Sequence, residues 1–142
     1  MITFFRKYSV YFAWGIALAS MLGSLYFSEV AQIAPCSLCW YQRIAMYPLV
    51  FILPVIIINR DTRIRPYILP LASIGTVIAL YHNLLTWGVV EEIIACAPGL
   101  SCAIQQINWL GFITIPLLSL LSFIGIIILT LIYKPDTYEQ GN

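Results

Sequence analysis

Long uninterrupted runs of apolar residues dominate the pattern of hydrophobic and polar positions along the chain. Four of them stand out, at about residues 8–27, 39–58, 66–87 and 109–133. A helix needs roughly 20 apolar residues to cross about 30 Å of hydrocarbon, and each run is near that length. Buried strands are usually only about 4–8 residues long, so the pattern predicts four transmembrane helices.

Composition supports the same class. Of the 142 residues, 61% are hydrophobic and only 9% are charged, whereas about a quarter of the residues of a soluble domain are charged. So few charges cannot cover a water-exposed surface, and we expect one all-α membrane domain over residues 1–142, a four-transmembrane-helix bundle surrounded by membrane lipid. The net charge of +1 comes without a basic stripe, which excludes nucleic acid as a partner.

Basic residues predict the orientation in the membrane. They lie before the first run, between the second and third, and after the fourth, as Arg6, Lys7, Arg60, Arg63, Arg65 and Lys134. By the positive-inside bias, both termini are expected in the cytoplasm of a bacterium, and the loops at about 28–38 and 88–108 on the outside of its inner (plasma) membrane. The first run is long for a cleaved signal peptide and no A-x-A site follows it, so we expect it to be retained.

All four cysteines fall in the two outward loops, Cys36 and Cys39 in the first, Cys96 and Cys102 in the second. The outer side of a bacterial membrane is oxidising, and disulfides persist there. Structural disulfides, within or between the loops, are one interpretation. A redox function is the other, because four membrane helices already hold the fold.

The sequence around the first cysteine pair favours redox chemistry. Pro35 suits the first turn of a helix, which would place Cys36 and Cys39 in that turn on one face. A helix N-terminus carries free N–H groups and a partial positive charge, and both stabilise a thiolate. Cys-x-x-Cys at such a position is typical of redox enzymes.

Two further polar residues are candidates for the site. Arg43 lies four residues after Cys39, one turn deeper on the same face. Its side chain either snorkels to the headgroups or stabilises the thiolate and the charge that develops on a reduced electron acceptor. His82, the only histidine, either bonds a neighbouring helix or donates to a quinone oxygen and manages protons.

A zinc site is the chemical alternative. Two cysteine pairs resemble a four-thiolate ligand set. The second pair is separated by five residues, outside the usual spacing, and a neighbouring arginine opposes a dication. We therefore expect no metal.

Residues 35–43, Pro-Cys-Ser-Leu-Cys-Trp-Tyr-Gln-Arg, resemble the signature of the DsbB family of quinone-linked disulfide formation proteins. The resemblance extends over the whole chain, to a cysteine pair in each outward loop and to the Trp-Leu-Gly-Phe sequence at residues 109–112 followed by Pro116. The short second loop is similar to that of the Gram-positive branch of the family. Vitamin K epoxide reductases share the same four-helix core.

The resemblance implies a relay of electrons. Cys96–Cys102 would take them from an extracytoplasmic thioredoxin-like dithiol oxidase, and Cys36–Cys39 would reoxidise that pair. A membrane quinone, menaquinone or ubiquinone, would then reoxidise Cys36–Cys39 beside Cys39 and Arg43, with His82 as a further candidate contact. The alternatives are a non-catalytic membrane scaffold with structural disulfides and a quinone reductase resembling the vitamin K enzymes.

Overall fold

The computed structural model describes residues 2–32, 35–59, 63–91 and 114–133, and their regular structure is helical throughout. The elements are α1 (Ile2–Leu25), the π-helical turn η1 (Tyr26–Val30), α2 (Ser37–Asn59), α3 (Arg65–Thr86) and α4 (Ile115–Ile132). Four spans are long and apolar enough to cross a membrane, and the first of them joins α1 to η1. These helices confirm the predicted all-α, multi-pass membrane class.

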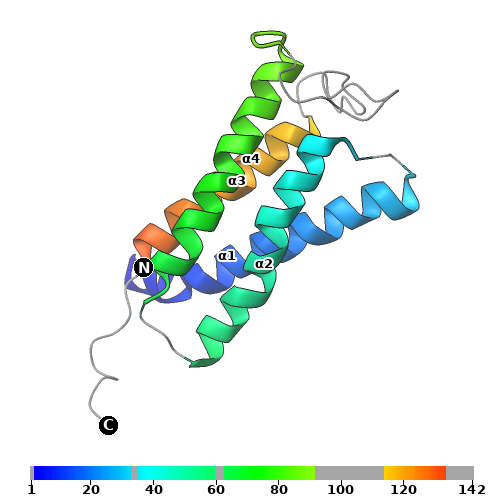
Figure 1. Ribbon diagram of the computed structural model, residues 1–142. Helices are drawn as coiled ribbons and strands as arrows, with labels where there is room; N and C mark the ends of the chain where they lie inside the picture. Colours follow the sequence, from blue (N-terminus) through cyan, green and yellow to red (C-terminus); the bar gives the residue numbers. More distant parts are fainter. Residues whose placement is uncertain (1, 33–34, 60–62, 92–113, 134–142) are drawn as a thin grey trace.

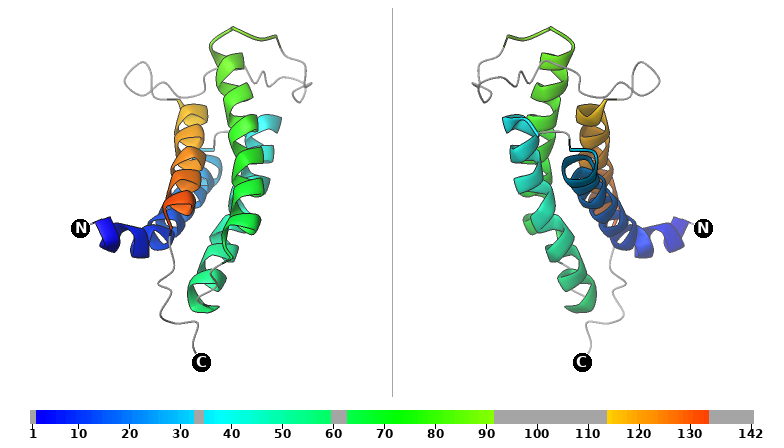
Figure 2. Two further views of the ribbon diagram at one scale, coloured as in Figure 1. Left: turned by 90° about the vertical axis from the view of Figure 1, so that its left-hand side faces the viewer. Right: turned by 90° about the vertical axis from the view of Figure 1, so that its right-hand side faces the viewer.

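The four helices pack as a ring around a shared core (Figure 1). Helices α1 and α3 each pack against both α2 and α4. Figure 2 shows α2 and α3 running along the bundle while α1 lies obliquely across it. The cavity described below lies inside this ring, between α1, α2 and α4.

Small side chains let the helices approach closely. Five alanines are almost fully buried at the helix contacts, namely Ala13, Ala17, Ala45, Ala72 and Ala79. Gly75 of α3 lies directly under the ring of Phe123 of α4, so that a Cβ at residue 75 would overlap that ring. Close backbone approach at small residues is the usual basis of helix packing in lipid, where no hydrophobic force drives the helices together.

The apolar runs located the helices but not their ends. Helix α1 begins at Ile2, well before the predicted start near residue 8, and α2 begins at Ser37 rather than 39. Helix α4 is described from Ile115, and residues 109–113, including Trp109, lie outside the described part of the chain. Apolar runs mark the hydrocarbon layer, whereas a helix continues as far as its backbone hydrogen bonds do.

Caps fix α3 and α4 at the end of the bundle that holds the cysteine pair. Gly88 follows α3 with a φ of 72°, and the amides of Gly88 and Val89 bond back to the carbonyls of Leu85 and Leu84, which is a Schellman cap. Thr114 caps α4 by accepting a hydrogen bond from the Leu117 amide. Both helix ends are thereby held next to the start of α2.

The opposite end of the bundle carries the described arginines of the middle connection. Arg63 and Arg65 are exposed there, and Arg65 Nη2 donates to the Leu131 carbonyl at the end of α4 at 3.0 Å. A cation at a helix C-terminus is favourable because the unpaired carbonyls there carry partial negative charge. The cytoplasmic location of this end stays a prediction.

Candidate thiol redox site

Cys36 caps α2. Its carbonyl accepts from the Trp40 amide at 3.2 Å, and its sulfur accepts from the Cys39 amide at 3.4 Å. These bonds put Cys36 at the N-cap position and Pro35 before it, one residue earlier than the predicted location in the first turn. The sulfur takes the place that a serine or aspartate oxygen usually occupies, which satisfies a free N–H group of the helix start.

The two sulfurs of the Cys36–Cys39 pair lie 3.0 Å apart. Both cysteines are free thiols, Cys36 buried and Cys39 partly buried. A disulfide needs a sulfur–sulfur distance of about 2.05 Å, so closure requires a movement of only about 1 Å. The predicted pairing of these residues on one helix face is confirmed.

The surroundings of Cys36 favour its thiolate. The pKa of Cys36 is lowered to about 4, mainly by the hydrogen bond that its sulfur accepts from the Cys39 thiol. Burial of Cys36 raises this pKa, and the interaction with His82 lowers it further. A sulfur with this pKa is ionised at neutral pH, and the thiolate is the form that attacks disulfides.

His82 faces Cys36 from α3. Its Nε2 lies 3.8 Å from the Cys36 sulfur, and its Nδ1 lies 3.0 Å from Nε2 of Gln42, which is also buried. Because the Gln42 amide nitrogen is a donor, Nδ1 accepts and the ring proton sits on Nε2, directed at Cys36. Gln42 thus sets the tautomer in which His82 stabilises the thiolate.

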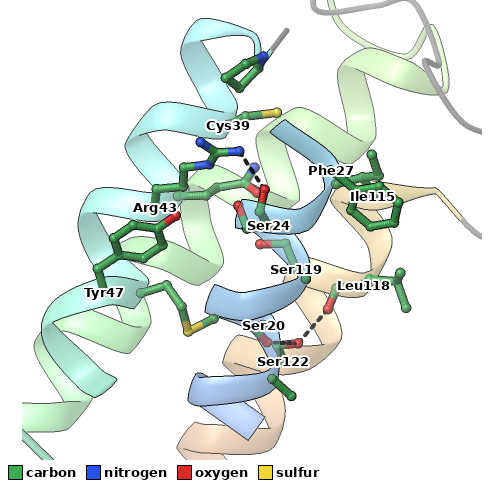
Figure 3. Close-up of a pocket in the computed structure, with 15 residues that line it drawn as sticks. Ser20, Ser24, Phe27, Cys39, Arg43, Tyr47, Ile115, Leu118, Ser119 and Ser122 are labelled. Atoms are coloured by element: carbon green, nitrogen blue, oxygen red, sulfur yellow. Dashed lines mark hydrogen bonds between the residues drawn. The ribbon is translucent and has the colours of Figure 1, made fainter. Parts of the chain in front are cut away.

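A cavity of about 320 Å³ opens beside Cys39 (Figure 3), and Cys36 is not among its lining residues. It is bounded by residues 19–27 of α1 and η1, by Pro35, by residues 39–47 of α2 and by residues 115–122 of α4. The lining is mostly apolar, and the volume is at the lower end of the roughly 300–1,000 Å³ found for small-molecule sites.

Arg43 reaches into the wall of this cavity. Its Nη2 donates to the Ser24 carbonyl at 3.0 Å, and its guanidinium lies over the Trp40 ring at 5.3 Å. Ser24 lies just before the junction between α1 and the π-helical turn η1. The guanidinium Nε is buried without a partner, while the Arg43 side chain as a whole is partly exposed.

Tyr47 is a second buried donor in the cavity wall that the sequence did not single out. Tyr47 lines the same cavity, and its buried hydroxyl has no hydrogen-bond partner. Cys39, Arg43 and Tyr47 follow one another at intervals of four along α2, so this register was the available signal. Ser24 and Gln42 were also missed, since helix spacing does not show which residues of neighbouring helices lie opposite.

The described structure thus brings together four of the six predicted site residues. Cys39 and Arg43 line the cavity, whereas His82 lies against Cys36 and is not among the lining residues. Cys96 and Cys102 lie outside the described residues. In the part of the chain that is described, Cys36, Cys39 and His82 form the one cluster with metal-ligand chemistry, its atoms within 4.8 Å of one another; a structural zinc site needs four ligands.

Membrane-length helices around an N-capping dithiol, with a cavity at its inner sulfur, define a membrane protein of thiol–disulfide chemistry. The chain belongs to the DsbB family, because the family model described as disulfide bond formation protein DsbB matches residues 6–133. The family forms disulfide bonds, which agrees with the reactive geometry of Cys36 and Cys39.

Individual relatives are similar over nearly their whole length. The chain is 49% identical over 131 residues to disulfide bond formation protein C of Bacillus subtilis (strain 168), covering 92% of this chain and 95% of that protein. It is 44% identical over 128 residues to probable disulfide formation protein C 1 of Bacillus anthracis, covering 89% and 92%. A probable disulfide formation protein of Deinococcus radiodurans is 43% identical over 127 residues, 83% of each chain. No solved structure gives a significant match.

Proposed function

We propose that this protein reoxidises an extracytoplasmic thioredoxin-like disulfide oxidase and passes the electrons through its two cysteine pairs to a membrane quinone. The proposal joins the disulfide-forming family to an oxidant that is soluble in the bilayer. A protein that makes disulfides repeatedly must discard two electrons per bond, and a lipid-soluble acceptor next to a membrane-embedded thiol removes them within the bilayer.

The observation that carries the proposal is the cavity at Cys39. Its lining is mostly apolar, it lies between membrane-length helices, and both Cys39 and Arg43 line it. A quinone ring is flat and apolar and carries two carbonyl acceptors, so these residues fit it. When bound, quinone supplies the final two-electron acceptor.

Each cysteine pair carries out one step of the electron transfer. The partner's dithiol would reduce the Cys96–Cys102 disulfide, and the resulting thiols would reduce the Cys36–Cys39 disulfide by exchange. Reoxidation of the Cys36 thiolate and the Cys39 thiol then releases two electrons and one proton and forms their sulfur–sulfur bond. Since Cys39 lines the cavity and Cys36 does not, Cys39 faces the quinone and Cys36 exchanges with the second pair.

His82 acts on the sulfur rather than directly on the quinone in this proposal. Its Nε2 is directed at Cys36, and Gln42 holds the ring from the other side. This position supports a role in stabilising the Cys36 thiolate and replaces the expected direct contact with quinone. Arg43 has the electrostatic role toward both the thiol pair and the cavity.

The location follows from the arginines and the family together. A bacterial plasma membrane with the cysteine end of the bundle outward would place the thiols where reduced secreted partners occur. Arg63 and Arg65, at the other end, would then face the cytoplasm. Labelling of the intact cell surface at an engineered cysteine in residues 28–32 tests this sidedness.

Two alternative functions, a membrane scaffold and a quinone reductase, require different properties of the cysteine pair and the cavity. A scaffold with structural disulfides does not need a thiol pKa of about 4 at a helix cap, which favours a reactive pair. A quinone reductase resembling the vitamin K enzymes would use the same cavity with a different thiol donor. Substrate tests with reduced partner and with quinone separate these activities.

Thiol trapping tests the proposal directly. The purified protein is incubated anaerobically with a reduced thioredoxin-like partner, with and without menadione or a short-chain ubiquinone. The reaction is quenched with acid, the free thiols are alkylated, and the linked cysteines are mapped by mass spectrometry. We expect oxidation of more than two equivalents of partner per protein only with quinone, and of no more than one equivalent in Cys36→Ser, whose second pair cannot be reoxidised. Equal partner oxidation by wild type and by Cys39→Ser would contradict the relay, and Ser37→Ala serves as the matched control.

A further inference from the structure

The inner wall of the cavity holds two buried hydrogen-bond donors without partners, Arg43 Nε and the Tyr47 hydroxyl. Leaving a buried hydroxyl unpaired costs about 1–3 kcal/mol in proteins, and a buried guanidinium N–H is likewise unfavourable. Within the described residues, these are the two buried donors without partners that belong to residues lining the cavity. Both can be satisfied by a ligand that brings an acceptor to this point.

The two donors are close in the structure. Tyr47 follows Arg43 by four residues, so its Cα lies about 6 Å further along α2 on the same face. Figure 3 shows the Tyr47 hydroxyl pointing toward the Arg43 side chain. The guanidinium itself is held by the Ser24 carbonyl and the Trp40 ring.

The other polar side chains toward the far end of the cavity are already engaged. Ser20 donates to Ser122, and Ser122 donates to the Leu118 carbonyl. These hydroxyls have partners within the protein, whereas Arg43 and Tyr47 have none for the atoms in question. The buried donors without partners therefore belong to Arg43 and Tyr47, and a polar ring fits beside them with any apolar tail toward Ser122.

We propose that Tyr47 is a second quinone-binding residue, whose hydroxyl donates together with Arg43 Nε to one carbonyl oxygen of the ring. This inference rests on the proposed function. A carbonyl oxygen has two lone pairs and can accept both hydrogen bonds. Two donors aimed at one oxygen stabilise it further when it gains negative charge during reduction, and they hold the ring edge beside the Cys39 sulfur.

Binding to the oxidised protein tests this role without any turnover. With the Cys36–Cys39 disulfide formed no electrons can pass, and the dissociation constant is measured by quenching of tryptophan fluorescence on titration with menadione or ubiquinone-1. Tyr47→Phe removes only the oxygen, and loss of one hydrogen bond should raise the constant about threefold to tenfold. Tyr41→Phe, the same change at an exposed position of α2, should leave it unchanged.

Infrared spectroscopy provides a readout of the contact itself. In the wild type one of the two carbonyl stretches of bound ¹³C-labelled quinone should be displaced to low frequency, and Tyr47→Phe should move that band back upward. If Tyr47→Phe unfolds, the wild-type spectrum still decides, because two equivalent carbonyl bands contradict the two-donor site.

The failures of the two proposals are distinguishable. A wild type that binds neither quinone overturns both the proposed function and the role of Tyr47. Wild-type binding that is unchanged in Tyr47→Phe, with an unmoved carbonyl band, overturns the role of Tyr47 alone and leaves the quinone site standing.

Discussion

At the scale of single residues, Cys36 combines a structural and a chemical role in one sulfur. The sulfur caps α2 by accepting a hydrogen bond from the Cys39 amide. It also accepts a hydrogen bond from the Cys39 thiol and lies next to Nε2 of His82. Each of these donors binds an anionic sulfur more strongly than a neutral one. The features that start the helix are therefore the same ones that make the thiol a nucleophile.

The first prediction concerns the pH dependence of this thiol. Because the pKa of Cys36 is lowered to about 4, the thiolate fraction should be nearly constant from pH 6 to pH 8 and decline only toward the acid end. In reduced Cys96→Ala/Cys102→Ala protein, the alkylation rate of Cys36 should be nearly flat over this interval. A rate that climbs through an ordinary thiol pKa of about 8.5 would contradict the proposed activation.

The second prediction separates the two possible roles of His82. His82→Phe removes the donor at Nε2, so the pKa of Cys36 should rise toward its ordinary value and its alkylation should slow at pH 6. Quinone affinity of the oxidised protein should not change, because His82 does not line the cavity. A weakened quinone affinity with an unchanged thiol titration would instead support direct contact between His82 and the quinone.

At the scale of elements, the junctions between helices position the site more than the helices themselves do. The π-helical turn η1 follows the carbonyl that holds Arg43, and the Schellman cap and Thr114 fix the ends of α3 and α4. These features place His82 and the cavity walls around the start of α2.

The third prediction tests the packing of α3 on α4. Gly75→Ala places a methyl group into the Phe123 ring, and overpacking of this kind typically costs about 1–3 kcal/mol. Thermal unfolding in detergent should occur at a lower temperature than in the wild type. Gly15→Ala is the matched control, because a Cβ there meets no atom within 4 Å; equal destabilisation by both variants would contradict the packing argument.

The sequence predicted the helices and part of the site for clear physical reasons. Length and hydropathy identify a membrane span, and a spacing of three or four residues places Cys36, Cys39 and Arg43 on one face. The side of the bundle on which His82 lies depends on how α3 is rotated against α2, which one sequence does not contain. Tyr47 was missed because a tyrosine in an apolar run is ordinary until its hydroxyl is found without a partner.

At the scale of the whole molecule, the fold places the Cys36–Cys39 pair at one end of a bundle of membrane-length helices, next to a cavity between them. The ring of four helices rests on buried apolar and small side chains, and the Cys36–Cys39 pair lies between the cap of α2 and the cavity. Most of the helix packing therefore rests on residues other than the cysteines.

The fourth prediction follows from this separation. Replacing both Cys96 and Cys102 with alanine should leave an inserted bundle with normal quinone affinity but abolish oxidation of the reduced partner. Quinone titration and partner-oxidation assays on the same preparation check this. Aggregation of the variant in detergent would contradict the independence of the fold from the second pair.

The central claim is that the Cys36–Cys39 dithiol delivers its two electrons to quinone in the cavity at Cys39. The most direct measurement is an anaerobic single turnover of reduced Cys96→Ala/Cys102→Ala protein with one equivalent of menadione, followed by ultraviolet absorbance and thiol counting. We expect one molecule of hydroquinone to form and two thiols to be lost per protein. Neither change should occur when Cys39→Ser is added to the same Cys96→Ala/Cys102→Ala protein. Quinone that stays oxidised while both thiols remain free would contradict the account.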